Sequence, residues 1–223
     1  MSELDPGVQL NAPWKLVSEI RSMSWDFRTQ LPPGGILAID LMSNRELQPF
    51  SDELMGFLVD LAEEGERALV IGGVARIDVV LERLLKAVLR PHSGGDDNLF
   101  DPDRPLGSFS AKISLAWRMG LLDTETERSL QMIRKIRNDF AHAETRISLS
   151  DAAITSRVRE LASCAKKAAP TGFDGLVKDL VGTVGSELKA SFCMSLVVVG
   201  NIIERCTREN RLIEVSQAIM NYS

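Results

Sequence analysis

Residues 68–89 constrain the fold more than any other part of the chain. Their apolar side chains recur at helical spacing over the whole segment: Val70, Ile71, Val74, Ile77, Val80, Leu81, Leu84, Leu85 and Val88. A stripe this wide is typical of a helix at the centre of a bundle, because it offers apolar surface to several neighbouring helices. We therefore expect a core helix here, with other helices packed around it.

Helical periodicity predicts further helices on both sides of this segment. Asn11 can cap a first helix, which ends at residues 31–35, and the interpretation of residues 36–50 is open because Pro49 interrupts them. A second helix starts at Ser51, with a break near Gly65. After a polar loop at 91–105, helices are expected at 108–119, 124–141, 150–164 and 176–208. The only weak strand candidate is 211–215.

The predicted fold class is therefore all-α, a single helical bundle over residues 51–223, preceded by an N-terminal extension, residues 1–50, with one helix. Ser150 is expected to cap the 150–164 helix, Thr124 and Glu127 to form a capping box, and Gly120 to end a helix at the C′ position. Gly72 and Gly73 lack the strand and lysine of a phosphate loop, and they indicate close helix packing.

Composition excludes several classes of protein. The formal net charge is −5, which is unfavourable for coating duplex DNA, although a local basic patch stays possible. Three widely spaced cysteines and two histidines suggest neither a disulfide framework nor a zinc finger. No signal peptide is visible, and the longest apolar stretch, 192–203, is too short to span a bilayer. We expect a cytoplasmic protein with no membrane segment, no metal site and no cofactor.

The most informative motif lies at the end of the 124–141 helix, where Arg137 precedes His142 by five positions. Asn138 and His142 are four apart and share one helix face. Histidine can transfer protons at a ribose hydroxyl, and a guanidinium can stabilise a phosphate in its transition state. The alternative is structural: His142 caps the helix end, and Arg137 pairs with Asp139 or a neighbouring helix.

The charge around this motif is positive. Between residues 128 and 146 the chain carries five basic residues and two acidic ones, Asp139 and Glu144. The basic residues are Arg128, Arg134, Lys135, Arg137 and Arg146. We take Arg134, Lys135 and Arg137 as the candidate nucleic-acid-binding ridge, and a solvated helix face paired with acidic helices as its alternative.

Arg137, Asn138 and His142 match, position by position, the Arg-polar-x3-His motif of the HEPN superfamily, which this segment resembles. The resemblance implies small helical domains that often dimerise, with the motif in a cleft between two protomers. Many members are metal-independent ribonucleases, and others are inactive or serve as interaction modules. By this resemblance His142 would be the general acid and base, Arg137 the phosphate stabiliser, and Asn138 a residue that orients the phosphate or the imidazole.

A second resemblance covers roughly residues 68–143. The segment 104–122, which contains Pro105, Leu106 and Gly107, is similar to the Pro-Leu-Gly segment of the mannitol operon repressor family, where a helix ending in an Arg-x4-His stretch also follows. The resemblance implies a transcriptional regulator without a recognisable DNA-binding motif. From the residues alone, we expect the Pro-Leu-Gly turn to be structural, with Leu106, Ile113, Leu115 and Trp117 in the core.

Two functional hypotheses follow. The first is a regulatory or interaction protein that acts as a homodimer, with nucleic acid or a protein partner bound through the Arg134–His142 face. The second is a HEPN-type endoribonuclease that uses Arg137, Asn138 and His142. A third, a small-molecule enzyme, has only the large apolar interior in its favour.

Overall fold

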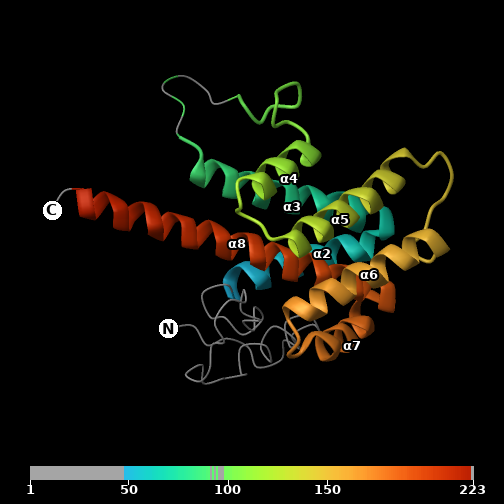
Figure 1. The fold of residues 1–223 in the computed structure, drawn as a ribbon. Helices are drawn as coiled ribbons and strands as arrows, with labels where there is room; N and C mark the ends of the chain where they lie inside the picture. The colour runs from blue at the N-terminus through green and yellow to red at the C-terminus, as the bar shows by residue number, and fades with distance from the viewer. Residues whose placement is uncertain (1–47, 91, 93, 95–97, 222–223) are drawn as a thin grey trace, which may run out of the picture.

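The computed structural model describes residues 48–90, 92, 94 and 98–221. Within these residues the chain forms seven helices and no strand, which confirms the all-α prediction (Figure 1). The helices are α2 (Gln48–Glu64), α3 (Glu66–Val88), α4 (Phe109–Arg118), α5 (Thr124–His142), α6 (Ala152–Ala168), α7 (Phe173–Val184) and α8 (Glu187–Asn221). The expected helix capped by Asn11 lies outside the described residues.

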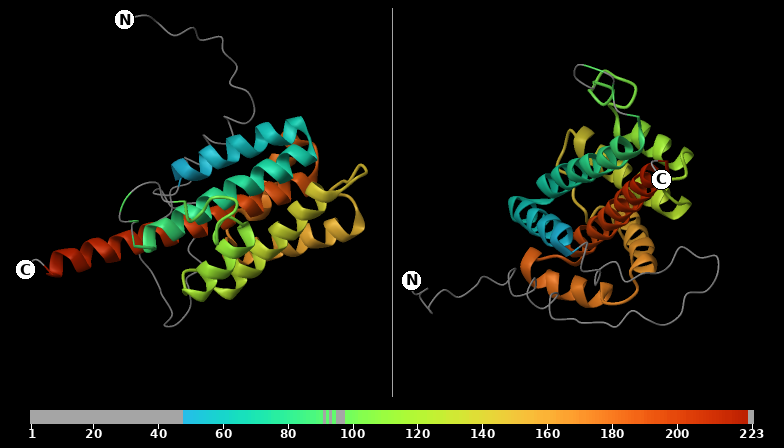
Figure 2. Two further views of the ribbon diagram at one scale, coloured as in Figure 1. Left: turned by 90° about the horizontal axis from the view of Figure 1, so that it is seen from above. Right: turned by 90° about the vertical axis from the view of Figure 1, so that its left-hand side faces the viewer.

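Two helices form the centre of the bundle, α3 and α8. They pack against each other, with α2, α6 and α7 against α8, and with α4 and α5 against α3 (Figure 2). The core position of α3 confirms the prediction made from its apolar stripe, since Ile77, Leu81 and Leu84 are fully buried.

Close helix packing at the paired glycines is also confirmed. A Cβ atom on Gly73 would lie 2.8 Å from side-chain carbons of both Leu58 and Leu196, and one on Gly72 would lie 2.7 Å from Leu61. These distances are shorter than ordinary van der Waals contact, so glycine lets α3 approach α2 and α8 closely. The pair has a packing function, as expected.

The apolar stretch of α8 is buried inside the bundle. Residues 192–201 are all buried, as predicted for a core helix. Over the described residues, Glu187–Asn210 is the one helical segment long and apolar enough to span a membrane by composition, with mean hydropathy 1.3. Since 72% of its apolar window is covered by the rest of the chain, bundle packing accounts for its hydropathy.

The predicted bounds of the last helix, 176–208, were wrong. The structure has two helices there, because Gly185 adopts a left-handed conformation with φ of +74° and ends α7. α8 then continues to Asn221, so the weak strand candidate at 211–215 was also wrong. Its C-terminal end extends beyond the other helices in Figure 1.

One expected helix start and two expected caps differ from the structure. α2 begins at Gln48, and Ser51 is instead buried, with its hydroxyl donating to Asn201 Oδ1 at 3.0 Å. The N-cap of α5 is Asp123, whose carboxylate accepts from Thr126 N at 2.7 Å, so no capping box forms at Thr124. The residue preceding α6 is Asp151 rather than Ser150, and α6 continues past Cys164 to Ala168.

Candidate functional site

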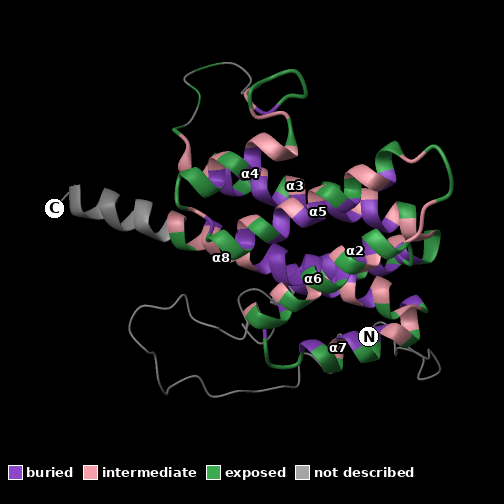
Figure 3. Cartoon of the chain, turned by 45° about the vertical axis from the view of Figure 1, so that its right-hand side comes forward, coloured by how far each residue is buried: buried purple, intermediate pink, exposed green. Residues whose placement is uncertain are grey.

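α5 is amphipathic, and its buried face fixes which side chains point outward. Leu130, Ile133, Ile136 and Phe140 are fully buried against the rest of the bundle. Their spacing turns the opposite side of the helix to solvent, and Figure 3 shows buried and exposed bands along α5. The outward surface near its C-terminal end, called here the α5 face, consists of Arg134, Lys135, Arg137, Asn138 and His142.

The three motif residues lie at the last turns of α5. Arg137 and His142 are exposed, whereas Asn138 is half-buried. Arg137 Nη1 donates to Asn138 Oδ1 at 3.2 Å, so these two residues are brought together. Within the described part of the chain the side chain of His142 makes no hydrogen bond, so none joins it to Arg137.

Two of the structural contacts considered for the motif are made by other residues. At the end of α5, the guanidinium of Arg67 donates to the carbonyl oxygens of Phe140 and Ala143. Asp139 forms an ion pair with Arg157 of α6, not with Arg137. Arg67 and Arg157 therefore supply the helix-end and interhelical contacts, and the side chains of Arg137 and His142 stay available to solvent.

The basic ridge is smaller than the sequence window implied. Arg128 is compensated by an ion pair with Glu160. Arg134 is half-buried, and its Nε donates to Gln131 Oε1 at 2.9 Å. Lys135 is exposed. Like Arg134 and Arg137, it has no carboxylate partner among the described residues.

A cleft of about 510 Å³ adjoins the end of α5. It is called here the basic cleft, and it is lined by residues 64–68, residues 146–148 and Lys189. Its cations are Arg67, Arg146 and Lys189. Sequence reasoning included Arg146 in the basic window but missed Arg67 and Lys189. No signal could have found them, because the three come from α3, a loop and α8, far apart in the sequence.

The Pro-Leu-Gly segment is structural, as expected, but for a different reason. Gly107 has no positive φ. A Cβ at this position would instead lie 2.1 Å from the carbonyl oxygen of Asp101, so the backbone of the loop leaves no room for a side chain. Trp117 was predicted to lie in the core and is 46% exposed, because it sits on the outer side of α4.

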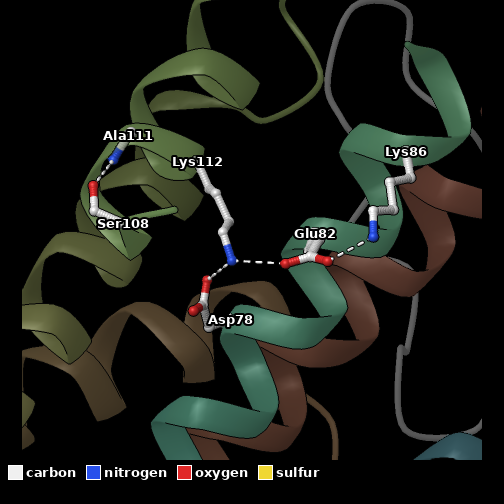
Figure 4. A network of polar contacts seen from close by, with 6 residues as sticks. All are labelled: Asp78, Glu82, Lys86, Ser108, Ala111 and Lys112. Atoms are coloured by element: carbon white, nitrogen blue, oxygen red, sulfur yellow. Dashed lines mark hydrogen bonds and ion pairs between the residues drawn. The ribbon is translucent and has the colours of Figure 1, made fainter. Parts of the chain in front are cut away.

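A buried lysine joins this segment to the core. Lys112 Nζ in α4 lies 2.9 Å from both Asp78 Oδ1 and Glu82 Oε2 of α3, and Glu82 also pairs with Lys86 (Figure 4). Burial opposes the charge of Lys112, but its two carboxylate partners outweigh burial and raise its pKa. The two lysines balance the two carboxylates, so this cluster fixes α4 on α3 without a ligand.

Over the described residues, no group of three or more His, Cys, Asp or Glu side chains is placed to hold a metal ion. The three cysteines, Cys164, Cys193 and Cys206, are free thiols. Burial raises the pKa of Cys193 to about 12, so this thiol stays protonated and unreactive at neutral pH.

Comparisons of the chain with protein-family models, with curated proteins and with solved structures gave no match. The two family resemblances are therefore carried by the residues quoted for them, and what they imply about function stays a prediction.

Proposed function

We propose that this chain is a helical regulatory module that acts as a homodimer and contacts nucleic acid through the α5 face. The observation that carries the proposal is the charge of this face. Arg134, Lys135 and Arg137 have no carboxylate partner among the described residues, whereas the neighbouring Asp139 is neutralised by Arg157. Arg134 and Arg137 are three residues apart and therefore adjacent on the surface of α5, and neighbouring unpaired cations are the electrostatic requirement for binding phosphates.

The overall charge of the chain makes this binding local. A net charge of −5 repels a polyanion at long range, so a nucleic acid must meet the protein where the surface is positive. The similarity to the mannitol operon repressor family supports a regulatory role. That family has no recognisable DNA-binding motif, and such a helix face would be one way to make the contact.

A second candidate function, metal-independent RNA cleavage, is favoured by the free side chain of His142. An imidazole that neither caps the helix nor bonds to a described residue can accept the proton of a ribose 2′-hydroxyl. The 2′-oxygen would attack phosphorus, the bond from phosphorus to the 5′-oxygen would break, and the protonated imidazole would return its proton to the departing 5′-oxygen. Arg137 would stabilise the extra charge on the phosphate, and Asn138 would orient Arg137 through its existing hydrogen bond.

We expect this reaction to use both protomers. No hydrogen bond joins the side chains of Arg137 and His142 among the described residues, and a homodimer could bring a second copy of the motif to the same substrate. The HEPN resemblance implies the same arrangement, in which the motif lies between protomers.

The binding proposal is tested with fluorescent single-stranded RNA and duplex DNA. The combined change Arg134→Ala and Arg137→Ala should weaken binding at least about tenfold, because each lost phosphate contact removes about 1 kcal/mol or more. The control is Arg83→Ala with Arg118→Ala, two exposed arginines on α3 and α4 that change the net charge equally. Equal affinity of the α5-face variant and the wild type would reject the proposal.

RNA cleavage is measured on the same oligonucleotides in the presence of a chelator. The His142→Ala variant should bind within about twofold of the wild type and cleave nothing, because it loses the proton-transfer group and no permanent charge. Cleavage by His142→Ala at the wild-type rate, or no cleavage by the wild type, would reject the ribonuclease function and leave the binding proposal intact.

A further inference from the structure

The basic cleft lies next to the end of α5, but it is formed by other elements. Its walls are the end of α2, the start of α3, the loop after α5 and the first turn of α8. Arg67 connects the two features, since its guanidinium lines the cleft and also donates to the carbonyl of Ala143 at 3.4 Å. The volume, about 510 Å³, is within the range of small-ligand sites.

The cations of the cleft are held by carbonyl oxygens instead of carboxylates. Lys189 Nζ donates to the carbonyl of Ala62 at 3.0 Å, and Arg67 donates to carbonyls at the end of α5. A carbonyl accepts a hydrogen bond but leaves the positive charge uncompensated. Arg146 is exposed, and no ion pair joins it to a described residue.

Helix capping explains only part of this arrangement. Lys189 and Arg67 satisfy the last carbonyls of α2 and α5, a role that basic residues often have at helix ends. The same contacts hold their head groups in the cleft wall and leave spare donors, because an ammonium has three N–H groups and a guanidinium five. Capping does not account for Arg146, which reaches the cleft from a loop.

Two acidic residues also line the cleft. The carboxylate of Glu66 is engaged, since it accepts from Leu149 N at 2.8 Å. Glu64 is exposed at the end of α2. The three cations therefore exceed the two anions, and one of those anions is directed at the backbone of the loop.

We propose that the basic cleft binds a phosphate group, with Arg67 and Lys189 as fixed donors and Arg146 as the residue that closes on the anion. A guanidinium offers paired N–H groups that match phosphate oxygens, which suits Arg146 to this role. The phosphate has two possible sources, a nucleic acid that continues past the α5 face or a free small phosphate compound. The site does not depend on whether the α5 face binds nucleic acid.

The test measures the binding of inorganic phosphate by titration calorimetry and by the shift in melting temperature, at constant ionic strength with chloride as reference. The wild type should bind phosphate, and Arg146→Ala should weaken binding about tenfold. The control, Arg104→Ala, removes one exposed arginine from the loop before α4 and should bind like the wild type.

A second variant is expected to bind phosphate more tightly than the wild type, and a folding defect could not produce that result. Glu64→Gln removes one negative charge from the cleft wall, so it should strengthen phosphate binding about two- to fivefold. No phosphate binding by the wild type, an equal loss in Arg104→Ala, or no gain in Glu64→Gln would overturn the proposal.

Competition then identifies the source of the phosphate. An RNA oligonucleotide that displaces phosphate indicates a nucleic-acid subsite, and one that does not displace it indicates a small phosphate ligand. Phosphate binding retained in the variant with Arg134→Ala and Arg137→Ala would separate this site from the proposed function, because only the α5 face is changed there.

Discussion

At position 107 the loop before α4 folds back so closely that a hydrogen atom is the only side chain that fits. A Cβ would meet the carbonyl oxygens of Asp101 and Pro102 at 2.1 and 2.6 Å. Both obstacles are backbone atoms, which move only if the loop itself rearranges. The sequence indicated a structural turn at Pro105–Gly107, but it could not show the close approach, which depends on where residues 101 and 102 return in space.

Gly107→Ala should therefore destabilise the protein by about 1–3 kcal/mol, the usual cost of overpacking a tight contact. The matched control is Gly56→Ala in α2, where an added Cβ meets nothing within 4 Å and φ is not positive. That change should be neutral or stabilise by up to about 1 kcal/mol, because alanine favours the helix. Urea denaturation measures the unfolding free energy of each variant. Equal values for Gly107→Ala and Gly56→Ala would contradict the close backbone approach at Gly107.

Lys112 is the second residue whose role is settled by packing. Its side chain is only 4% exposed, while its partners Asp78 and Glu82 keep about a quarter of their surface in water, at 29% and 25%. Lys112→Met should cost about 2–3 kcal/mol, less than a fully buried pair, because water can still solvate the two carboxylates. Thermal denaturation measures this loss, and an unchanged melting temperature would contradict it.

The same cluster makes stability depend on pH. Burial raises the pKa of Glu82, but hydrogen bonds from Lys86 and Lys112 outweigh it, and the pKa lies below its ordinary value of 4.5. A lowered carboxylate pKa stabilises the fold above the unfolded-state pKa, and this contribution is lost as the pH falls through the folded-state value. The stability difference between the wild type and Lys112→Met should therefore narrow below pH 4.5. A constant difference down to about pH 3 would be evidence against this linkage.

At the scale of the elements, periodicity predicted which segments are helical better than where each helix begins and ends. The core helix at 68–89 could be identified by its wide apolar stripe, and the buried stretch at 192–203 by its nearly continuous apolar side chains. The α7–α8 break could not be read from periodicity, because apolar spacing continues across Gly185. The N-cap positions Asp123 and Asp151 were missed by one residue, since neighbouring Thr124 and Ser150 are equally suitable caps in a sequence.

Gly185 and Gly182 provide a matched pair that tests this break. Neither has a neighbour within 4 Å of an added Cβ, but only Gly185 has a positive φ, +74°. Gly185→Ala should cost about 1–2 kcal/mol through the left-handed backbone alone. Gly182→Ala, inside α7, should be neutral or stabilise by up to about 1 kcal/mol. If denaturation experiments showed that Gly182→Ala lowers the unfolding free energy more than Gly185→Ala does, α7 and α8 would instead form one continuous helix.

At the scale of the whole molecule, the account requires a homodimer. The resemblance to dimeric helical domains implies it, and two-fold pairing is the commonest assembly of soluble proteins. Sedimentation equilibrium at micromolar concentration should give twice the chain mass of 24.6 kDa. A single species at the chain mass would exclude the two-protomer arrangement on which RNA cleavage depends.

One part of the candidate site could be predicted from the sequence, whereas the other part depends on how the whole bundle packs. Arg137, Asn138 and His142 are close in sequence and lie on one helix, so their proximity follows from helical geometry. Arg67 and Lys189 come from α3 and α8, and only the packing of the whole bundle brings them to the end of α5. The pairing of Asp139 with Arg157 likewise depends on where α6 lies, and it determines which cations remain unpaired.

The salt dependence of RNA binding is the decisive measurement for the α5 face, because it counts the phosphates that the protein contacts. The slope of log affinity against log salt should fall by about one for each lost contact, so Arg134→Ala with Arg137→Ala should reduce it by about two. The paired control Arg83→Ala and Arg118→Ala should leave the slope unchanged. Melting temperatures measured alongside would show that both variants are folded. Equal slopes for the wild type and the α5-face variant would contradict the account.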